Sequence, residues 1–340
     1  MEILKLSQRV AQDCTSQVPV IVLGSGASAP HGIPGMGALG KHLASSVIAD
    51  SLGTIDLKGW DDFKDKIQTL DLESALTEVT LSPSLTQHIV RTTWTYLNSA
   101  DIAVFQEITG NRKLLPLTKL FQHLFNSTAT ELQVVTPNYD RLAEYAAEAA
   151  GYYAYTGFSF GMLGNRAEVP KITVRGKPQR TVNVWKVHGS FSWFQDRDGV
   201  VVSLPPSTGY STELEPLIVT PGIEKYRRTH GEPFRTTMQS ADRAITDAGA
   251  FLCIGYGFND EHLQPLLVQR CNSRKVPLVL LTQKISDKAH EFLRSGKCQR
   301  YLAMEECERG TMVFSNERPE GEELPGRSVW KLDKFLELIM

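Results

Sequence analysis

The sequence of 340 residues lacks any pair of cysteines spaced as in a zinc ribbon. Its five cysteines are scattered along the chain: Cys14, Cys253, Cys271, Cys298 and Cys307. Structural zinc sites are typically built from closely spaced pairs of ligands, so no metal is predicted. Unpaired thiols are typical of a reducing compartment, which predicts a cytoplasmic protein.

Long apolar runs and an excess of one charge are missing as well. No apolar segment approaches the roughly 18 residues that a membrane span needs. The first residues, MEILKLSQRVAQDCTSQ, hold no apolar core of a signal peptide. The 36 basic and 38 acidic residues give a formal net charge of −2. This balance argues against direct binding to nucleic acid or to a membrane surface.

Short apolar runs alternate with helical patterns through most of the chain. Runs such as VIVL after Pro19, LQVV from Leu132 and FLCI from Phe251 are bounded by turn residues. Such runs favour buried strands, and their alternation with helices favours a parallel sheet covered on both faces. The sequence therefore predicts an α/β protein with a Rossmann-like parallel sheet flanked by helices.

The expected organisation is one domain, 1–340, whose Rossmann-like core is formed by residues 18–56 and 131–290. Residues 57–130 have helical spacing with few strand signals, so they are expected to form a helical insertion. Residues 291–340 are expected to be a C-terminal extension that ends in an amphipathic helix.

The C-terminal helix and two polar stretches complete this outline. The apolar stripe of the helix is made of Val329, Leu332, Phe335, Leu336 and Ile339. A stripe of this kind packs either on its own domain or on another subunit, and the sequence leaves both open. The turn-rich stretches 195–214 and 316–328 are expected to be loops.

Unusual residues follow four of the predicted strands. They are Gly24-Ser25-Gly26-Ala27-Ser28, Thr136-Pro137-Asn138-Tyr139-Asp140, His188-Gly189-Ser190 and Gly255-Tyr256-Gly257-Phe258-Asn259-Asp260. The carboxyl ends of parallel strands meet at one edge of a sheet, and ligands bind in the crevice outside that edge. We therefore expect the four loops to line one crevice.

The first loop suits an anion such as a pyrophosphate. Its glycines let the backbone turn sharply and approach a ligand, and N–H groups at the following helix favour negative charge. The loop is not G-x-G-x-x-G, because Ala29 and Pro30 break that spacing, and no Gly-Lys-Ser/Thr of a P-loop follows. A tight turn without a ligand has the same residues, so this loop alone identifies no site.

The other loops offer hydrogen-bonding and acid–base groups. Asn138 can bind ribose hydroxyls and a water, and Asp140 can bind a hydroxyl or an amide, although both residue types also cap helices. His188 can act as a general acid or base near neutral pH, although such a histidine is also common in structural roles. The GYGFND loop and Thr282 can contact an adenosine, or can simply end their strands.

Together, GSGASAPHGIP, PNYD, HG and GYGFND, in this order, resemble the SIR2-like (sirtuin-type) NAD-binding family. The first block is similar to the family's G-A-G-A-S-x-x-x-G-I-P motif over Gly24–Pro34, PNYD to Q-N-x-D, and HG to the catalytic His-Gly pair. The sequence differs from sirtuin deacylases at 35–37, where GMG replaces Asp-Phe-Arg, at Pro137, which replaces glutamine, and in lacking a zinc ribbon. It looks closer to the zinc-free SIR2-like effectors of bacterial antiviral defence.

The resemblance implies an NAD hydrolase that cleaves NAD, its substrate, into nicotinamide and ADP-ribose. The implied catalytic residues are Asn138, His188 and Asp140. The implied nucleotide-binding residues are Gly24, Ser25, Gly26, Ala27, Ser28, Gly255, Gly257, Asn259 and Thr282.

The resemblance also implies a setting for this activity. The expected protein is a homo-oligomeric effector that acts in anti-phage defence by NAD depletion. A separately encoded ATPase or sensor protein would control it, and nucleic acid would be involved only indirectly. Three alternatives stay open: a non-catalytic sensor of NAD or ADP-ribose, a nucleic-acid effector subunit, and an NAD-dependent protein deacylase.

Overall fold

The computed structural model describes residues 2–46, 53–167, 172–222, 231–274 and 276–340. The helices are α1 (Glu2–Ser16), α2 (Ser25–Ser28), the 3-10 turn η1 (Ala29–His31), α3 (Met36–Ser45), α4 (Thr54–Lys66), α5 (Leu72–Thr77), α6 (Pro83–Gly110), α7 (Pro116–Leu124), α8 (Leu142–Ala149), α10 (Phe234–Asp247), α11 (Leu263–Arg274), α12 (Asp287–Arg294) and α13 (Leu332–Ile339). None of the described helices is long and apolar enough to cross a membrane.

The strands fall into a large sheet and two small ones. They are β1 (Val20–Leu23), β2 (Glu131–Thr136), β3 (Tyr153–Tyr155), β4 (Gly164–Asn165), β5 (Thr173–Val174), β6 (Lys177–Pro178), β7 (Thr181–Lys186), β8 (Gly189–Gln195), β9 (Val201–Ser203), β10 (Glu215–Ile218), β11 (Phe251–Ile254), β12 (Leu278–Leu281), β13 (Tyr301–Cys307), β14 (Gly310–Ser315) and β15 (Arg318–Pro325). Within the described residues, the large sheet has the order β15-β14-β13-β12-β11-β1-β2-β7-β3, and a small one has the order β10-β8-β9-β4.

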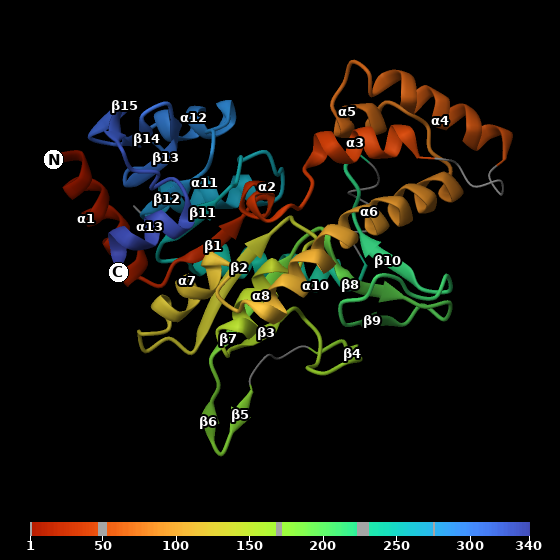
Figure 1. Ribbon diagram of the computed structural model, residues 1–340, viewed down its shortest axis with the longest axis horizontal. Coiled ribbons are helices and arrows are strands. Elements are labelled where there is room, and N and C mark those ends of the chain that lie inside the picture. The colour runs from red at the N-terminus through yellow and green to blue at the C-terminus, as the bar shows by residue number, and fades with distance from the viewer. Residues whose placement is uncertain (1, 47–52, 168–171, 223–230, 275) are drawn as a thin grey trace.

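The large sheet is parallel from β13 to β3, and β14 and β15 extend it antiparallel at one edge (Figure 1). The prediction of a Rossmann-like parallel sheet is confirmed. Because β2 joins one side of β1 and β11 joins the other, the strand order reverses at β1. In such sheets the carboxyl ends beside the reversal form the ligand crevice.

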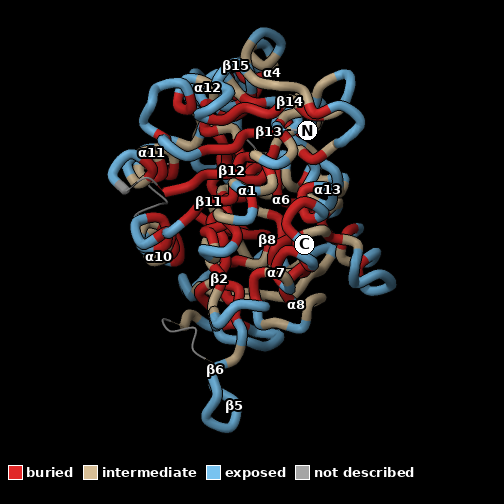
Figure 2. Tube along the Cα trace, turned by 90° about the vertical axis from the view of Figure 1, so that its left-hand side faces the viewer, coloured by how far each residue is buried: buried red, intermediate tan, exposed pale blue. Residues whose placement is uncertain are grey.

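Side chains of β1 alternate between the two faces of this sheet. Ile21 and Leu23 lie in the apolar core that includes residues of α1, α7, α8 and α13. Val20 and Val22 lie in the core that includes residues of α10, α11 and α12. This alternation is the period of two expected of a strand, and Figure 2 shows the strands as a buried centre between helices whose outer sides are exposed.

The residues expected to be helical, 57–130, contain most of α4 and all of α5, α6 and α7. The long helix α6 joins two parts of the molecule. Its N-terminal half packs in an apolar cluster with Trp60, Phe63 and Phe191, the last from the small sheet. Its C-terminal half, with Ile108, reaches the core of the large sheet. The helices α4 and α5 and the N-terminal half of α6 are thereby packed beside the small sheet, whose strand β8 follows β7.

Two stretches that were expected to be loops contain strands, so those predictions were wrong. The stretch 316–328 contains β15, which pairs with β14, and the stretch 195–214 contains β9, which pairs with β8. The strand β15 is the outermost of its sheet and has solvent on its open side. An edge strand can therefore carry glutamates and a glycine in place of apolar residues, which hides the strand pattern.

The apolar stripe of the C-terminal helix packs on the chain's own core. Phe335 is 0% exposed, and Leu336 and Ile339 are buried where α13 lies against α1 and α7. The sequence left open whether the stripe packs on its own domain or on another subunit, and the structure shows packing on its own domain. This stripe therefore provides no free surface for a second subunit.

Candidate active site

A cavity of about 330 Å³ opens at the carboxyl ends of β1, β2, β7 and β11. All four glycine-rich or polar loops contribute to its wall. The predicted site residues that line it are Gly24, Ser25, Ser28, Asn138, Asp140, His188, Gly255, Gly257 and Asn259. Met36 of α3, Glu73 of α5 and Leu97 of α6 line it as well, so the helices beside the small sheet form part of the wall.

Three predicted nucleotide-binding residues are not part of this lining: Gly26, Ala27 and Thr282. The amide of Gly26 donates to the Gly255 carbonyl at 3.1 Å, and the amide of Ala27 donates to the Gly24 carbonyl at 3.0 Å. These two donors therefore already have protein acceptors. The hydroxyl of Thr282 donates to a backbone carbonyl two residues further on, at 3.1 Å. Roles in nucleotide binding stay predictions for these three residues.

Gly24 and Gly255 allow the first and fourth loops to touch. A Cβ atom on Gly24 would lie 2.2 Å from the Gly255 carbonyl oxygen, and one on Gly255 would lie 2.2 Å from the Ala27 amide nitrogen. Gly255 also has a φ of +57°, in the left-handed region that side chains disfavour. The glycines therefore serve the contact between two loops of the protein.

We expect Gly255→Ala to destabilise the protein far more than Gly32→Ala. Both glycines have positive φ, but a Cβ on Gly32 meets nothing within 4 Å, whereas one on Gly255 meets backbone. The left-handed conformation alone costs about 1 kcal/mol, and overpacking adds roughly 1–3 kcal/mol. Urea unfolding of both variants measures the difference. Equal losses of stability would contradict the close contact between the loops.

Asn138, Ser28 and Asp140 form a hydrogen-bonded group at the cavity wall. Asn138 Nδ2 donates to the Gly24 carbonyl at 2.9 Å and contacts Ser28 Oγ at 3.1 Å. Ser28 Oγ donates to Asp140 Oδ2 at 2.7 Å, and Asp140 Oδ1 accepts from the Leu142 amide at 3.2 Å. Since these bonds engage Nδ2 of Asn138, its Oδ1 is the atom that can accept a hydrogen bond from a ligand hydroxyl or a water.

The peptide group between Asp140 and Arg141 is held at both ends by buried charges. Lys186, which is 0% exposed, donates from Nζ to the Asp140 carbonyl oxygen. The Arg141 amide donates to Asp101 Oδ1 at 2.7 Å. Burial raises the pKa of the Asp140 carboxyl above its usual range, and the Lys186 ammonium opposes that rise. The position of Asp140 is therefore set by groups from α6 and β7.

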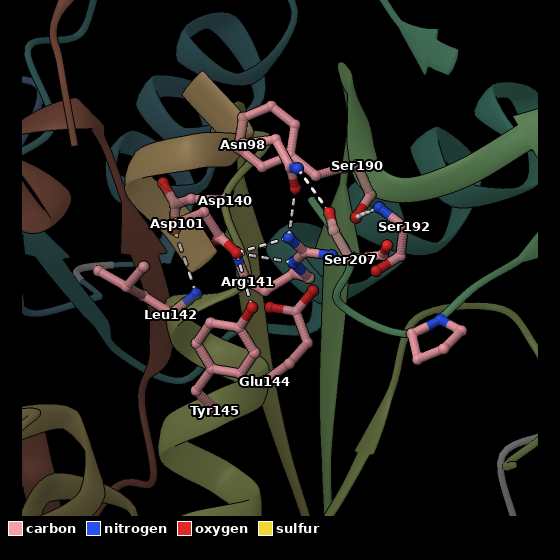
Figure 3. Close-up of polar contacts among 12 residues, drawn as sticks. Asn98, Asp101, Asp140, Arg141, Leu142, Glu144, Tyr145, Ser190, Ser192 and Ser207 are labelled. Atoms are coloured by element: carbon pink, nitrogen blue, oxygen red, sulfur yellow. Dashed lines mark hydrogen bonds and ion pairs between the residues drawn. The ribbon is translucent and has the colours of Figure 1, made fainter. Parts of the chain in front are cut away.

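Arg141 lies in a buried polar cluster with Asn98, Asp101 and Tyr145 (Figure 3). Its Nε donates to Asp101 Oδ2 at 2.8 Å, and its Nη2 donates to Asn98 Oδ1 at 2.5 Å. The hydroxyl of Tyr145 donates to Asp101 Oδ2 at 2.6 Å. The side chains of Arg141 and Asp101 are 3% and 0% exposed. The sequence analysis did not predict this cluster. Its local signal is weak: Asn98 and Asp101 lie three positions apart on the mostly apolar buried face of α6.

The carboxyl group of Glu144, on α8, lies beside the Lys186 ammonium. Its Oε1 lies 3.2 Å from Lys186 Nζ. Burial raises the pKa of the Glu144 carboxyl to about 7, although the Lys186 ammonium acts to lower it. The folded protein thus binds a proton at Glu144 more tightly than the unfolded chain does.

This shift predicts a pH dependence of stability. Because the folded-state pKa of Glu144 lies above its ordinary value of 4.5, its contribution is fully present below pH 4.5 and is lost as the pH rises through about 7. Relative to Glu144→Gln, the wild-type protein should lose up to about 3 kcal/mol across this window. Urea unfolding of both proteins over a pH series measures the difference. Parallel stability curves would show that Glu144 titrates normally.

His188 lies at the corner where the chain leaves the large sheet for the small one. Its Nε2 is 3.1 Å from Asp260 Oδ2, and the two side chains are 13% and 7% exposed. The next residue, Gly189, has a φ of +97°, and a Cβ there would lie 2.1 Å from the Leu217 carbonyl oxygen. Glycine is therefore required for the corner that places His188 in the cavity wall. Asp260 was not predicted as a site residue, although it ends the GYGFND loop.

Metal binding has no obvious place among the described residues. No three His, Cys, Asp or Glu side chains there form a group that could hold a metal ion. The cysteines are free thiols, and all except Cys307 are buried. That the protein needs no metal stays a prediction.

Residues 132–298 match the family model of the SIR2-like domain. Similar solved structures include a Sir2 homologue in complex with NAD, at 13% identity, covering 88% of this chain and 87% of that chain with a TM-score of 0.46. Another is a Sir2 homologue variant in complex with ADP-ribose, at 15% identity, covering 83% and 88% with a TM-score of 0.42. No curated protein matches the chain.

The family match covers three of the four loops at the cavity. It includes Asn138, Asp140, His188 and the loop 255–260, whereas the first loop and the helices before β2 precede it. The organisation of 1–340 as a single domain therefore stays a prediction. The matched segment also contributes β2, β7, β11 and β12 to the parallel sheet. Residues 132–298 of this chain thus resemble the SIR2-like domain family.

Proposed function

We propose that the cavity binds NAD and that the protein hydrolyses the bond between nicotinamide and ribose, which yields nicotinamide and ADP-ribose. The observation that carries the proposal is the meeting of Asn138, Asp140 and His188 at one cavity beside the Gly24–Gly255 contact. The match of residues 132–298 to the SIR2-like domain supports NAD as the substrate.

The three polar residues fit the demands of this reaction. Nicotinamide leaves as a neutral base, and the ribose passes through a state with oxocarbenium character that a water must capture. Asn138 Oδ1 would orient a ribose hydroxyl or the water, and Asp140, through Ser28, would help to place the ribose. His188 would accept the proton. Positioning and proton transfer each contribute several powers of ten to such rates.

The remaining lining residues would hold the rest of the dinucleotide. Ser25 and Ser28 present hydroxyls on the first loop, where we place the pyrophosphate. Gly257 and Asn259 of the fourth loop would face the adenosine half. Hydroxyl and backbone donors suit phosphate oxygens, and an asparagine suits a ribose or a base edge.

We also propose that the protein is a regulated effector of bacterial antiviral defence that acts by depleting NAD. An unrestrained NAD hydrolase would harm its own cell, so its activity must be held in check. The helices α3, α5 and α6 supply Met36, Glu73 and Leu97 to the cavity wall. A shift of these helices on assembly with copies of the chain, or with a separate ATPase or sensor protein, would change access to NAD.

One set of incubations separates this proposal from its alternatives. Purified protein is given NAD alone, NAD with an acylated peptide, or NAD with DNA, and the products are followed by chromatography. We expect nicotinamide and ADP-ribose from NAD alone. Nicotinamide release only with the acylated peptide would identify a deacylase, binding of NAD without turnover would identify a sensor, and DNA cleavage would identify a nucleic-acid effector.

A further inference from the structure

We propose that Asp260 is the positioning residue of His188, so that the acid–base group at the cavity is a histidine–aspartate pair. The proposal deepens the proposed NAD hydrolysis, and its catalytic consequence rests on that function. It starts from the 3.1 Å between Asp260 Oδ2 and His188 Nε2, which join the fourth loop to the corner after β7.

Asp260 is held in place independently of His188. Its Oδ1 accepts hydrogen bonds from the amides of His262 and Leu263, at 3.0 and 2.9 Å, at the start of α11. A carboxylate that caps a helix in this way has a fixed orientation. One oxygen of Asp260 therefore serves the helix, while the other is presented to the imidazole.

Burial strengthens the electrostatic interaction between these two side chains. The side chains of His188 and Asp260 are 13% and 7% exposed, so little water screens their interaction. A carboxylate at this distance stabilises the imidazolium that forms when the base is protonated.

The proposed step balances without any further reactant. The bond between ribose C1′ and the nicotinamide nitrogen breaks, and its electron pair leaves with nicotinamide. Water oxygen bonds to C1′, and the proton that the water loses passes to the His188 imidazole. Asp260 carries the opposite charge to the transient imidazolium, which then releases its proton to solvent. No electrons are gained or lost in the sequence.

Other titratable groups also face this region. His262 lies edge-on to His188, with ring centroids 6.4 Å apart. Glu73 from α5, and Tyr139 and Asp140 from the turn after β2, line the same cavity. Tyr256 lines the cavity as well, and the Asp260 charge contributes to the raised pKa values of Tyr139 and Tyr256. Both hydroxyls stay protonated at acidic pH, so a shift of the acidic limb reports on the imidazole.

The test compares Asp260→Asn with Asp71→Asn. Asparagine is as good a helix cap as aspartate, so Asp260→Asn removes the charge and keeps the cap of α11. Asp71 caps α5 through a hydrogen bond of 2.9 Å from the Ser74 amide and is not part of the cavity lining, so Asp71→Asn is the matched control. Thermal unfolding of both variants checks that each remains folded.

We expect Asp260→Asn to lower kcat for NAD cleavage at least about a hundredfold, with KM changed by less than about threefold. The acidic limb of the pH–rate profile should move about one unit to lower pH, because the lost carboxylate no longer favours a protonated imidazole. Asp71→Asn should match the wild-type protein in both respects. A kcat for Asp260→Asn within threefold of wild type, with an unmoved profile, would overturn the proposal.

A second readout separates this proposal from the proposed function. If the wild-type protein cleaves no NAD, the hydrolase assignment fails, and the His188–Asp260 pair is then tested by NMR titration of the imidazole. The His188 signal is identified by its loss in His188→Gln. Its midpoint should fall by about one pH unit in Asp260→Asn. An unchanged midpoint would show that Asp260 does not act on His188.

Discussion

Replacing His188 or Asn138 by alanine is expected to lower the rate of NAD cleavage at least about a thousandfold while the protein stays folded. Both side chains line the cavity at neighbouring strand ends, and each has a distinct task in the proposed reaction. His188 accepts the proton that the water or ribose hydroxyl loses. Without the imidazole, that proton has no acceptor at the cavity. Asn138 orients the ribose or the water, so without it the reacting groups are seldom aligned.

The measurement is the initial rate of nicotinamide release by each variant at saturating NAD. Matched controls come from the same chain: His123→Ala and Asn126→Ala change the same residue types outside the cavity lining. They should keep the wild-type rate. Full activity in a folded His188→Ala or Asn138→Ala protein would remove that residue from the proposed mechanism.

Replacing Asp101 by alanine is expected to destabilise the protein by about 3–5 kcal/mol. Asp101 is fully buried, and it accepts bonds from the Arg141 guanidinium, the Arg141 amide and the Tyr145 hydroxyl. Its loss leaves a buried guanidinium without its carboxylate. One of the two contacts that hold the peptide group after Asp140 is lost with it, while the Lys186 contact remains. NAD cleavage should therefore fall further than the loss of stability alone explains.

Urea unfolding of Asp101→Ala and Glu317→Ala tests this expectation. Glu317 pairs with Arg9 at 2.7 Å, but their side chains are 59% and 68% exposed. Solvent screens such a pair, so Glu317→Ala should leave the unfolding midpoint almost unchanged. If the two substitutions had similar effects, the buried cluster would not be a main contributor to stability.

The convergence of the loops could be predicted because it depends on a general property of parallel sheets. Gly24, Asn138, His188 and Gly255 each follow a short apolar run, and parallel strands bring such positions to one edge. The structure places all four at the cavity. The roles given to them rest on chemistry that the fold alone does not test.

The contacts that support these residues could not be predicted in the same way. Asp101 and Arg141 are 40 positions apart, and a helix of ordinary apolar spacing carries Asp101. The contact between His188 and Asp260 depends on the turn at Gly189 and on the cap of α11. Neither feature repeats along the sequence, so periodicity does not reveal it. The edge strand β15 was missed because its outward position removes the need for apolar residues.

The proposed activity of this cavity is the cleavage of NAD between nicotinamide and ribose. Its most direct test is to incubate the intact chain with NAD at comparable concentrations, so that even a restrained enzyme yields measurable product, and to quantify every product by chromatography. We expect equal amounts of nicotinamide and ADP-ribose, and neither product with His188→Ala. Recovery of intact NAD from the wild-type protein, whether or not NAD binds to it, would contradict the claim.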